Sequence, residues 1–150
     1  MLAFNDLFVG VRSHVSARYK ITVSGRTESH SSSGVLISTG AGSTGWMSSV
    51  FNMAAGIATA QHGKQIQAPR LSWDAPQLLW AVREPFISRT SQAGLVCGTL
   101  EGSTVMEIES MTSESGVIFS DGIEADALEF NAGTIAAIGV ATRKARLVVP

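Results

Sequence analysis

Short apolar runs recur along this chain about every ten residues, and this spacing constrains the fold more than any other feature of the sequence. Glycine, serine, aspartate and asparagine separate the runs, as turn residues separate the strands of an antiparallel sandwich or barrel. Residues 25–33 are polar and are expected to form a loop or the end of a hairpin. The sequence therefore predicts a mainly β, sandwich-like domain with strands at residues 7–11, 19–24, 34–38, 71–73, 78–83, 93–100, 104–110, 116–119, 135–140 and 146–149.

One stretch follows a helical pattern instead. Residues 43–61 contain no proline and no charged side chain, and apolar residues recur there at helical spacing. Ser43 or Thr44 is the expected N-cap, and Gly63 is the expected stop. Because this helix carries no charge, we expect both of its faces to be covered. The apolar face comprises Trp46, Val50, Met53, Ala54 and Ile57.

Composition limits the class of protein. The 150 residues are 45% hydrophobic and only 15% charged, which excludes a disordered chain and a coiled coil. A net charge of −1 provides no basic field for nucleic acid, and no apolar run is long enough to span a membrane. The one cysteine, Cys97, lies in an apolar run and is expected to be buried. It excludes a disulfide within the chain, so a reducing, cytoplasmic setting is the simplest expectation.

A glycine-rich turn precedes the predicted helix. Residues 40–45, GAGSTG, formally match the dinucleotide-binding pattern G-x-G-x-x-G and lie between a predicted strand and a helix. That fold also needs an acidic residue near the end of the next strand, but none occurs between Trp46 and Asp74. A phosphate-binding Walker loop needs a lysine, and none lies between Lys20 and Lys64. The plain alternative is a tight turn in which glycines permit unusual backbone angles.

The residues around this turn resemble a known segment. Residues 35–46, VLISTGAGSTGW, resemble the Thr-Pro-Thr-Gly-Ser-Thr-Ala-Tyr segment of the NAD kinase family, and four positions match it: Thr39, Gly42, Ser43 and Thr44. Upstream, Asn5 and Asp6 resemble the family's Asn-Glu/Asp pair. Downstream, residues 120–122 resemble its late Asp-Gly turn, and residues 85–89 faintly resemble a stretch ending in Arg-Pro.

The resemblance implies a fold and a ligand. The C-terminal domain of NAD kinases is β-rich with few helices, and it shapes the site for NAD, the acceptor, and NADP, the product. ATP or polyphosphate, with Mg²⁺, is the donor in the complete enzyme. Carried over, Asn5 and Asp6 would bind the adenosine ribose, and the helix N-terminus would favour a phosphate. The residues that would line the adenine and ribose region are Ser38, Thr39, Gly42, Ser43 and Thr44, while Trp46 would either stack on a base or belong to the core.

The chain also departs from the family pattern. Gly40 and Ala41 replace a proline and a threonine, Gly45 and Trp46 replace Ala-Tyr, and Ser33 replaces an aspartate. The Gly-Gly-Asp-Gly-Thr loop, whose aspartate activates the acceptor, is absent from these 150 residues. Residues 1–150 are therefore expected to be a single acceptor-binding domain that lacks the donor-binding N-terminal domain. No catalytic residue and no metal ligand are assigned, and the chain alone is predicted to be inactive.

Three functions remain open at this point. The first is the acceptor-binding domain of an NAD kinase, with a small dinucleotide and the missing N-terminal kinase domain as partners. The second is a non-catalytic nucleotide-binding or assembly module of the same fold. The third is a domain of the wider kinase superfamily that acts on a lipid or another hydroxyl compound. The resemblance and the low charge both favour a homo-oligomer. We expect no nucleic-acid partner and no membrane span.

Overall fold

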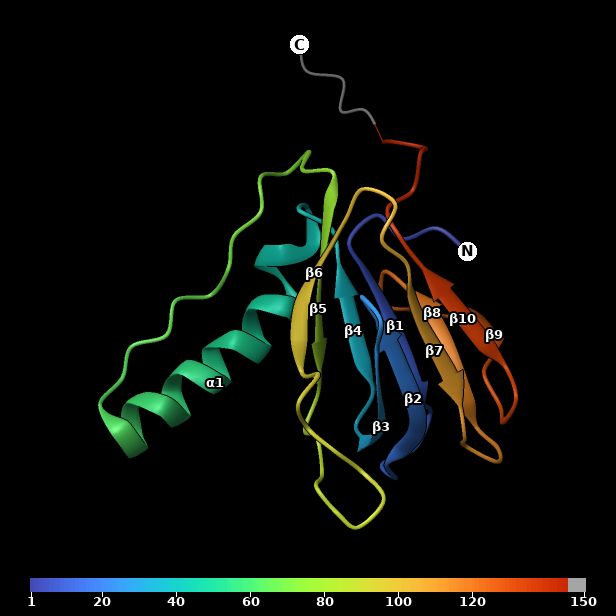
Figure 1. Ribbon diagram of the computed structural model, residues 1–150. Helices are drawn as coiled ribbons and strands as arrows, with labels where there is room; N and C mark the ends of the chain where they lie inside the picture. Colours follow the sequence, from blue (N-terminus) through green and yellow to red (C-terminus); the bar gives the residue numbers. More distant parts are fainter. Residues whose placement is uncertain (146–150) are drawn as a thin grey trace.

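Two antiparallel sheets face each other in the computed structural model, which describes residues 1–145 (Figure 1). The first sheet has the strand order β6-β5-β4-β1-β8-β9, and the second has the order β10-β7-β2-β3. This confirms the predicted mainly β sandwich. The strands are β1 (Asp6–Val11), β2 (Ala17–Val23), β3 (Arg26–Ser32), β4 (Val35–Ser38), β5 (Gln77–Val82), β6 (Cys97–Glu101), β7 (Met106–Ser110), β8 (Gly116–Ser120), β9 (Ile123–Glu129) and β10 (Ile135–Ile138).

The main core lies between the two sheets. Alternate residues of β2, namely Tyr19, Ile21 and Val23, point inward from the second sheet. Val9 and Val35 meet them from the first sheet and are fully buried. The alternation read from the sequence therefore becomes the two inner faces of the sandwich.

Only the first turns of the helix α1 (Trp46–His62) pack against the outer face of the first sheet. Met47 is buried against Leu36 and Leu79 in a second, smaller core. Beyond this contact the helix projects away from the sheets (Figure 1). Met53 and Ile57 are 49% and 57% exposed, so residues 1–145 by themselves do not cover this face of the helix.

Several predicted boundaries need correction. Most of the polar stretch 25–33 forms β3 (Arg26–Ser32), because Ser24 and Gly25 adopt positive φ angles and turn the chain back along all of β2. Residues 71–73 form no strand, and the predicted strand at residues 146–149 lies outside the described residues. Cys97 is exposed at the start of the edge strand β6, not buried. In residues 1–145, no helix is both long and apolar enough to cross a membrane.

Candidate functional site

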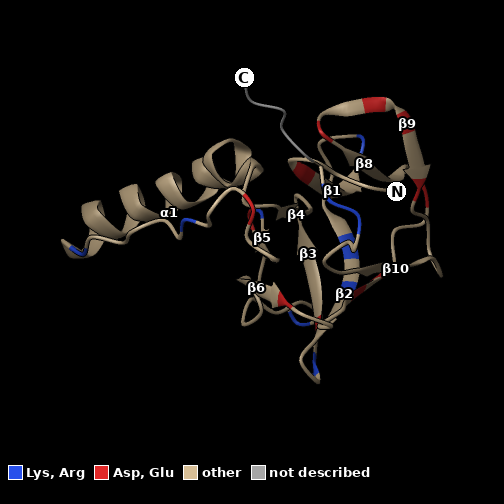
Figure 2. Cartoon of the chain, turned by 90° about the horizontal axis from the view of Figure 1, so that it is seen from above, with Lys and Arg blue, Asp and Glu red and all other residues tan. Residues whose placement is uncertain are grey.

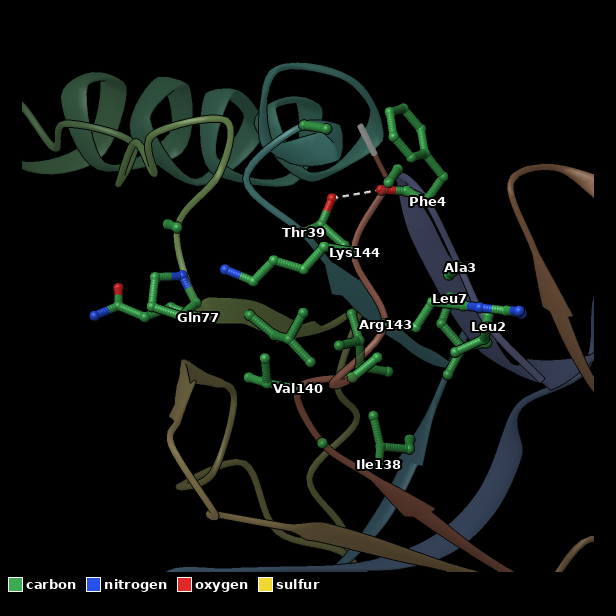
Figure 3. A pocket seen from close by; sticks show the side chains of 18 of the residues that line it. Leu2, Ala3, Phe4, Leu7, Thr39, Gln77, Ile138, Val140, Arg143 and Lys144 are labelled. Carbon is green, nitrogen blue, oxygen red and sulfur yellow. Dashed lines mark hydrogen bonds between the residues drawn. The ribbon is translucent and has the colours of Figure 1, made fainter. Parts of the chain in front are cut away.

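The glycine-rich turn and the Asn5–Asp6 pair meet in the structure, although 33 residues separate Ser38 from Asn5. The Thr39 N–H donates to the Asn5 carbonyl at 2.9 Å, and the Thr39 hydroxyl donates to the Phe4 carbonyl at 2.7 Å (Figure 3). The same hydroxyl accepts the Gly42 N–H at 3.2 Å. Thr39 therefore joins the two segments that the sequence analysis assigned to one site.

Two of the three glycines in this turn, Gly40 and Gly42, permit close packing of the backbone. A Cβ on Gly40 would lie 1.9 Å from the Ser72 carbonyl oxygen, and a Cβ on Gly42 would lie 2.3 Å from the Asn5 carbonyl oxygen. Neither glycine has a positive φ angle. The plain alternative explained these glycines by unusual backbone angles, and no positive φ supports it at these two positions. They instead make room for protein backbone, and residues 5 and 72 lie against the turn.

A third segment completes this arrangement. The Asp121 carboxylate accepts the backbone N–H groups of Phe4, Asn5 and Asp6 at 2.9, 2.6 and 3.2 Å. Sequence analysis noted Asp121 only as part of an Asp-Gly turn. The signal that would have found it is the β1–β8 pairing, which sets Leu7 opposite Ser120. Such a pairing is not visible in local sequence.

Asp6 is the acidic group at the centre of the site. Its Oδ1 is buried and has no hydrogen-bond partner within the described part of the chain. Burial raises the pKa of the Asp6 carboxyl above 3.8, the Ser38 hydroxyl opposes this shift, and the charge of Asp121 adds to it. A buried carboxylate oxygen without a donor is unusual, because buried polar groups are normally hydrogen-bonded.

The start of α1 differs from the prediction. The N-cap is Gly45, and no side chain caps the helix; it is preceded by a short 3₁₀ turn, η1 (Gly42–Thr44). The Ser43 hydroxyl is buried and donates to the Gly40 carbonyl at 2.8 Å, so it stabilises the turn. Thr44 is exposed. The expected cap at Ser43 or Thr44 is therefore wrong, while the expected stop at Gly63 is confirmed by its left-handed conformation.

Like Ser43, the predicted ligand-lining residues Ser38 and Trp46 pack into the protein. Ser38 is fully buried, and its hydroxyl donates to the Thr39 carbonyl at 3.1 Å. The Trp46 ring stacks on Phe8 with 5.5 Å between centroids. The Arg83 guanidinium lies over the same ring at 5.1 Å. Trp46 therefore fits the core alternative better than the base-stacking one.

Ser33 lies apart from the Asn5–Asp6 pair. It precedes β4, whereas Asp6 is paired with Ser38 at the other end of that strand. Its hydroxyl donates to Glu84, and it lines a second cavity of about 480 Å³ with Arg12 and His14. The position where serine replaces the family's aspartate is therefore not part of the candidate site.

A cavity of about 590 Å³ adjoins the site, within the size range of small-molecule pockets. Its apolar wall comes from both sheets, with Leu7 and Ile37 on one side and Ile138 on the other (Figure 3). Two basic side chains, Arg143 and Lys144, also line this cavity. Phe4 and Trp73 form an edge-to-face pair at its rim, 5.8 Å apart.

The acidic groups near the cavity do not fit a divalent cation. In residues 1–145, no three His, Cys, Asp or Glu side chains lie close enough to share a metal ion. Asp6 and Asp121 are neighbours, but three backbone N–H groups already occupy the Asp121 carboxylate. Mg²⁺ takes about six oxygen ligands, and the only buried oxygen of this pair without a partner in residues 1–145 is Asp6 Oδ1.

Comparison with solved structures shows the same fold in two nucleotide kinases. An NAD kinase from Archaeoglobus fulgidus, solved in complex with ATP, matches with a TM-score of 0.62 and 19% identity, over 95% of this chain and 47% of that one. Yeast NADH kinase, solved with NADH, matches with a TM-score of 0.57 and 20% identity, over 89% of this chain and 32% of that one. No protein-family model matches the sequence, and no curated protein is significantly similar to it. The chain has the fold of an NAD kinase C-terminal domain, and it spans less than half the length of these two enzymes.

Proposed function

We propose that this chain is the acceptor-binding domain of an NAD kinase-type phosphotransferase and binds NAD or NADP. The observation that carries the proposal is the hydrogen-bonded junction of Thr39 with Phe4 and Asn5 in a fold shared with NAD kinases. The junction brings together the two segments that resemble the family's binding motifs.

The chemistry of the site suits a ribose. A carboxylate such as that of Asp6 can accept a ligand hydroxyl, and the Asn5 amide can both donate and accept. Thr44 is exposed at the uncapped start of α1, where backbone N–H groups favour a phosphate. Arg143 and Lys144 line the adjoining cavity and supply positive charge for the rest of a dinucleotide.

Catalysis belongs to the complete enzyme in this proposal. The aspartate that activates the acceptor, the phosphate donor (ATP or polyphosphate) and its Mg²⁺ are assigned to a donor-binding domain outside these 150 residues. Phosphoryl transfer depends on positioning and charge stabilisation from both halves. The chain alone is therefore expected to bind a dinucleotide without phosphorylating it.

The test is the melting temperature of the pure chain with NAD, NADP or ATP, each at millimolar concentration. A ligand at about 100 times its Kd stabilises a protein by about 2.7 kcal/mol. For a domain of this size, that corresponds to a rise of roughly 5–10 °C. Asn5→Ala should abolish the shift, whereas Asn52→Ala, on the exposed side of α1, should preserve it. The proposal fails if neither NAD nor NADP shifts the melting temperature, or if the Asn5 variant responds like the wild type.

The apolar cavity favours a second candidate, a superfamily domain that binds a lipid-like alcohol. Leu7, Ile37, Leu78, Ile138 and Val140 would contact an alkyl chain, and Thr39 lies at the same cavity beside the Asn5 site. In the same assay, 1-octanol would then stabilise the chain and NAD would not. A shift with NAD alone would exclude this candidate.

Self-association is a further part of the proposal. The projecting part of α1 carries no charged residue (Figure 2). Met53 and Ile57 are exposed on it. Such a surface is typical of one that is covered in an assembly. Sedimentation analysis of the wild type and of Met53→Glu tests this: the wild type should be oligomeric and the variant smaller. The same surface would also suit a non-catalytic assembly module. In that case the chain would self-associate but bind no nucleotide.

A further inference from the structure

Asp121 lies in a tight turn whose backbone conformation does not by itself require an aspartate. It lies between β8 and β9 with φ 54°, followed by Gly122 with φ 73°. Two consecutive left-handed residues suit a tight hairpin turn, and Asn-Gly or Gly-Gly would serve as well as Asp-Gly. Turn chemistry therefore explains a polar or small residue here, but it does not explain a carboxylate.

The carboxylate has a separate role, because both of its oxygens accept hydrogen bonds from a distant segment. Oδ2 accepts the Phe4 N–H, and Oδ1 accepts the N–H groups of Asn5 and Asp6. These residues lie 115 to 117 positions away in the sequence. Hydrogen bonds to a charged acceptor are stronger than those between neutral groups.

The backbone of residues 4–6 is fully paired as a result. Asp121 takes its three N–H groups, and the Asp121 N–H donates to the Asp6 carbonyl at 2.8 Å. Thr39 donates to the other two carbonyls, those of Phe4 and Asn5. All six polar backbone groups of this segment have protein partners. The Asn5 and Asp6 side chains are then the polar groups that the segment can offer a ligand.

We propose that Asp121 is a positioning residue for the ligand site: its carboxylate fixes the peptide units of residues 4–6, so that the Asn5 and Asp6 side chains are presented together. The inference rests on the proposed function for the identity of the ligand, NAD. The hydrogen bonds by which Asp121 and Thr39 hold the backbone of residues 4–6, here called the clamp, do not depend on the identity of the ligand. Asp121 touches no ligand in this role; it acts through the backbone of the pair.

A second consequence separates this role from simple support of the fold. The negative charge of Asp121 is one of the causes that raise the pKa of Asp6. Removing the charge, with the turn kept intact, should lower the pKa of Asp6 and weaken ligand binding together. A residue that only stabilised the β8–β9 turn would change the melting temperature and leave the pKa of Asp6 unchanged.

The test uses Asp121→Asn, since asparagine tolerates the left-handed conformation. Asp121→Gly is the second variant; it relaxes the backbone and removes the carboxylate. Asp126→Asn on the exposed strand β9 is the matched control, because it changes the net charge equally. NAD affinity is measured by titration, and NMR follows amide exchange at residues 4–6 and the titration of Asp6.

Both Asp121 variants should raise the Kd for NAD by at least about tenfold, the amides of residues 4–6 should lose protection, and the pKa of Asp6 should fall. The control should match the wild type in all three. The inference is overturned if folded Asp121 variants keep the amide protection or bind NAD within about twofold of the wild type. If the wild type itself binds no NAD, the proposed function fails, and the amide exchange and Asp6 titration still decide whether Asp121 forms the clamp.

Discussion

Gly42→Ala is the substitution that tests most directly how the glycine-rich turn works. A Cβ at position 42 would lie 2.3 Å from the Asn5 carbonyl oxygen and 2.8 Å from the Asn5 Cα. Both are backbone atoms, and the Asn5 peptide is held by Thr39 and Asp121, so it cannot move aside cheaply. The methyl group must therefore separate the turn from residues 4–6.

The cost follows from two effects. Overpacking a well-packed interior costs about 1–3 kcal/mol. Loss of the hydrogen bond between Thr39 and Asn5 adds about 1 kcal/mol. For a domain of this length, the melting temperature should fall by roughly 5–12 °C. Because Asn5 moves, NAD binding should weaken as well.

Gly56→Ala is the matched control for this measurement. Gly56 lies in α1, and a Cβ there would meet no atom within 4 Å. Alanine is favoured over glycine inside a helix by about 0.5–1 kcal/mol, so this variant should melt slightly higher than the wild type. Thermal unfolding followed by circular dichroism compares the two.

The reasoning is refuted if Gly42→Ala melts within about 1 °C of the wild type, since a clash of the expected size would cost several times more. If that variant is stable but no longer binds NAD, Gly42 makes room for the ligand and not for Asn5. Either result would change the interpretation of the turn from packing to recognition.

Two further predictions concern buried titratable groups. Because the pKa of Asp6 is raised above 3.8, the folded protein keeps that proton at pH values where the unfolded chain has lost it, and stability falls as the pH rises through this window. Asp6→Asn should therefore melt higher than the wild type at about pH 7 and equally below about pH 4, while losing affinity for NAD; equal melting at both pH values would contradict this. His30 is buried against the Tyr19 ring, and burial lowers its pKa below 6.5, with Glu28 opposing the shift. Stability should then fall as the pH drops below about 6.5, and His30→Phe, which keeps the ring stack, should flatten this dependence of the melting temperature.

The helix shows where local pattern and tertiary structure diverge. Its existence and its end at Gly63 follow from residues 43–63, because the absence of proline and the helical spacing are local properties. Its start was predicted three residues too early, since Ser43 is used to bond the Gly40 carbonyl. Whether its faces are covered depends on packing partners, and the described chain covers only the first turns.

The β-rich fold could be predicted for a similar reason. A strand with one buried face alternates in the sequence, as β2 does, and turn residues mark its ends. β3 was missed because its residues, RTESHSS, are polar, and it is a strand only through its pairing with β2. Its inward residues His30 and Ser32 are buried polar groups, which apolar spacing cannot reveal.

By itself, the sequence determined the sandwich, the helix after the glycine-rich turn and the two segments that resemble NAD kinase motifs. Each of these depends on residues that are close together in the chain. Only the tertiary structure decided that Asn5 meets Thr39, that Gly40 and Gly42 make room for backbone, and that Asp121 holds the N–H groups of residues 4–6. These contacts depend on the pairing of β1 with β4, between residues 26 to 32 positions apart, and with β8, between residues more than 100 positions apart. The physical reason is that the partner of a polar group is set by the register of a whole sheet, which no single segment encodes.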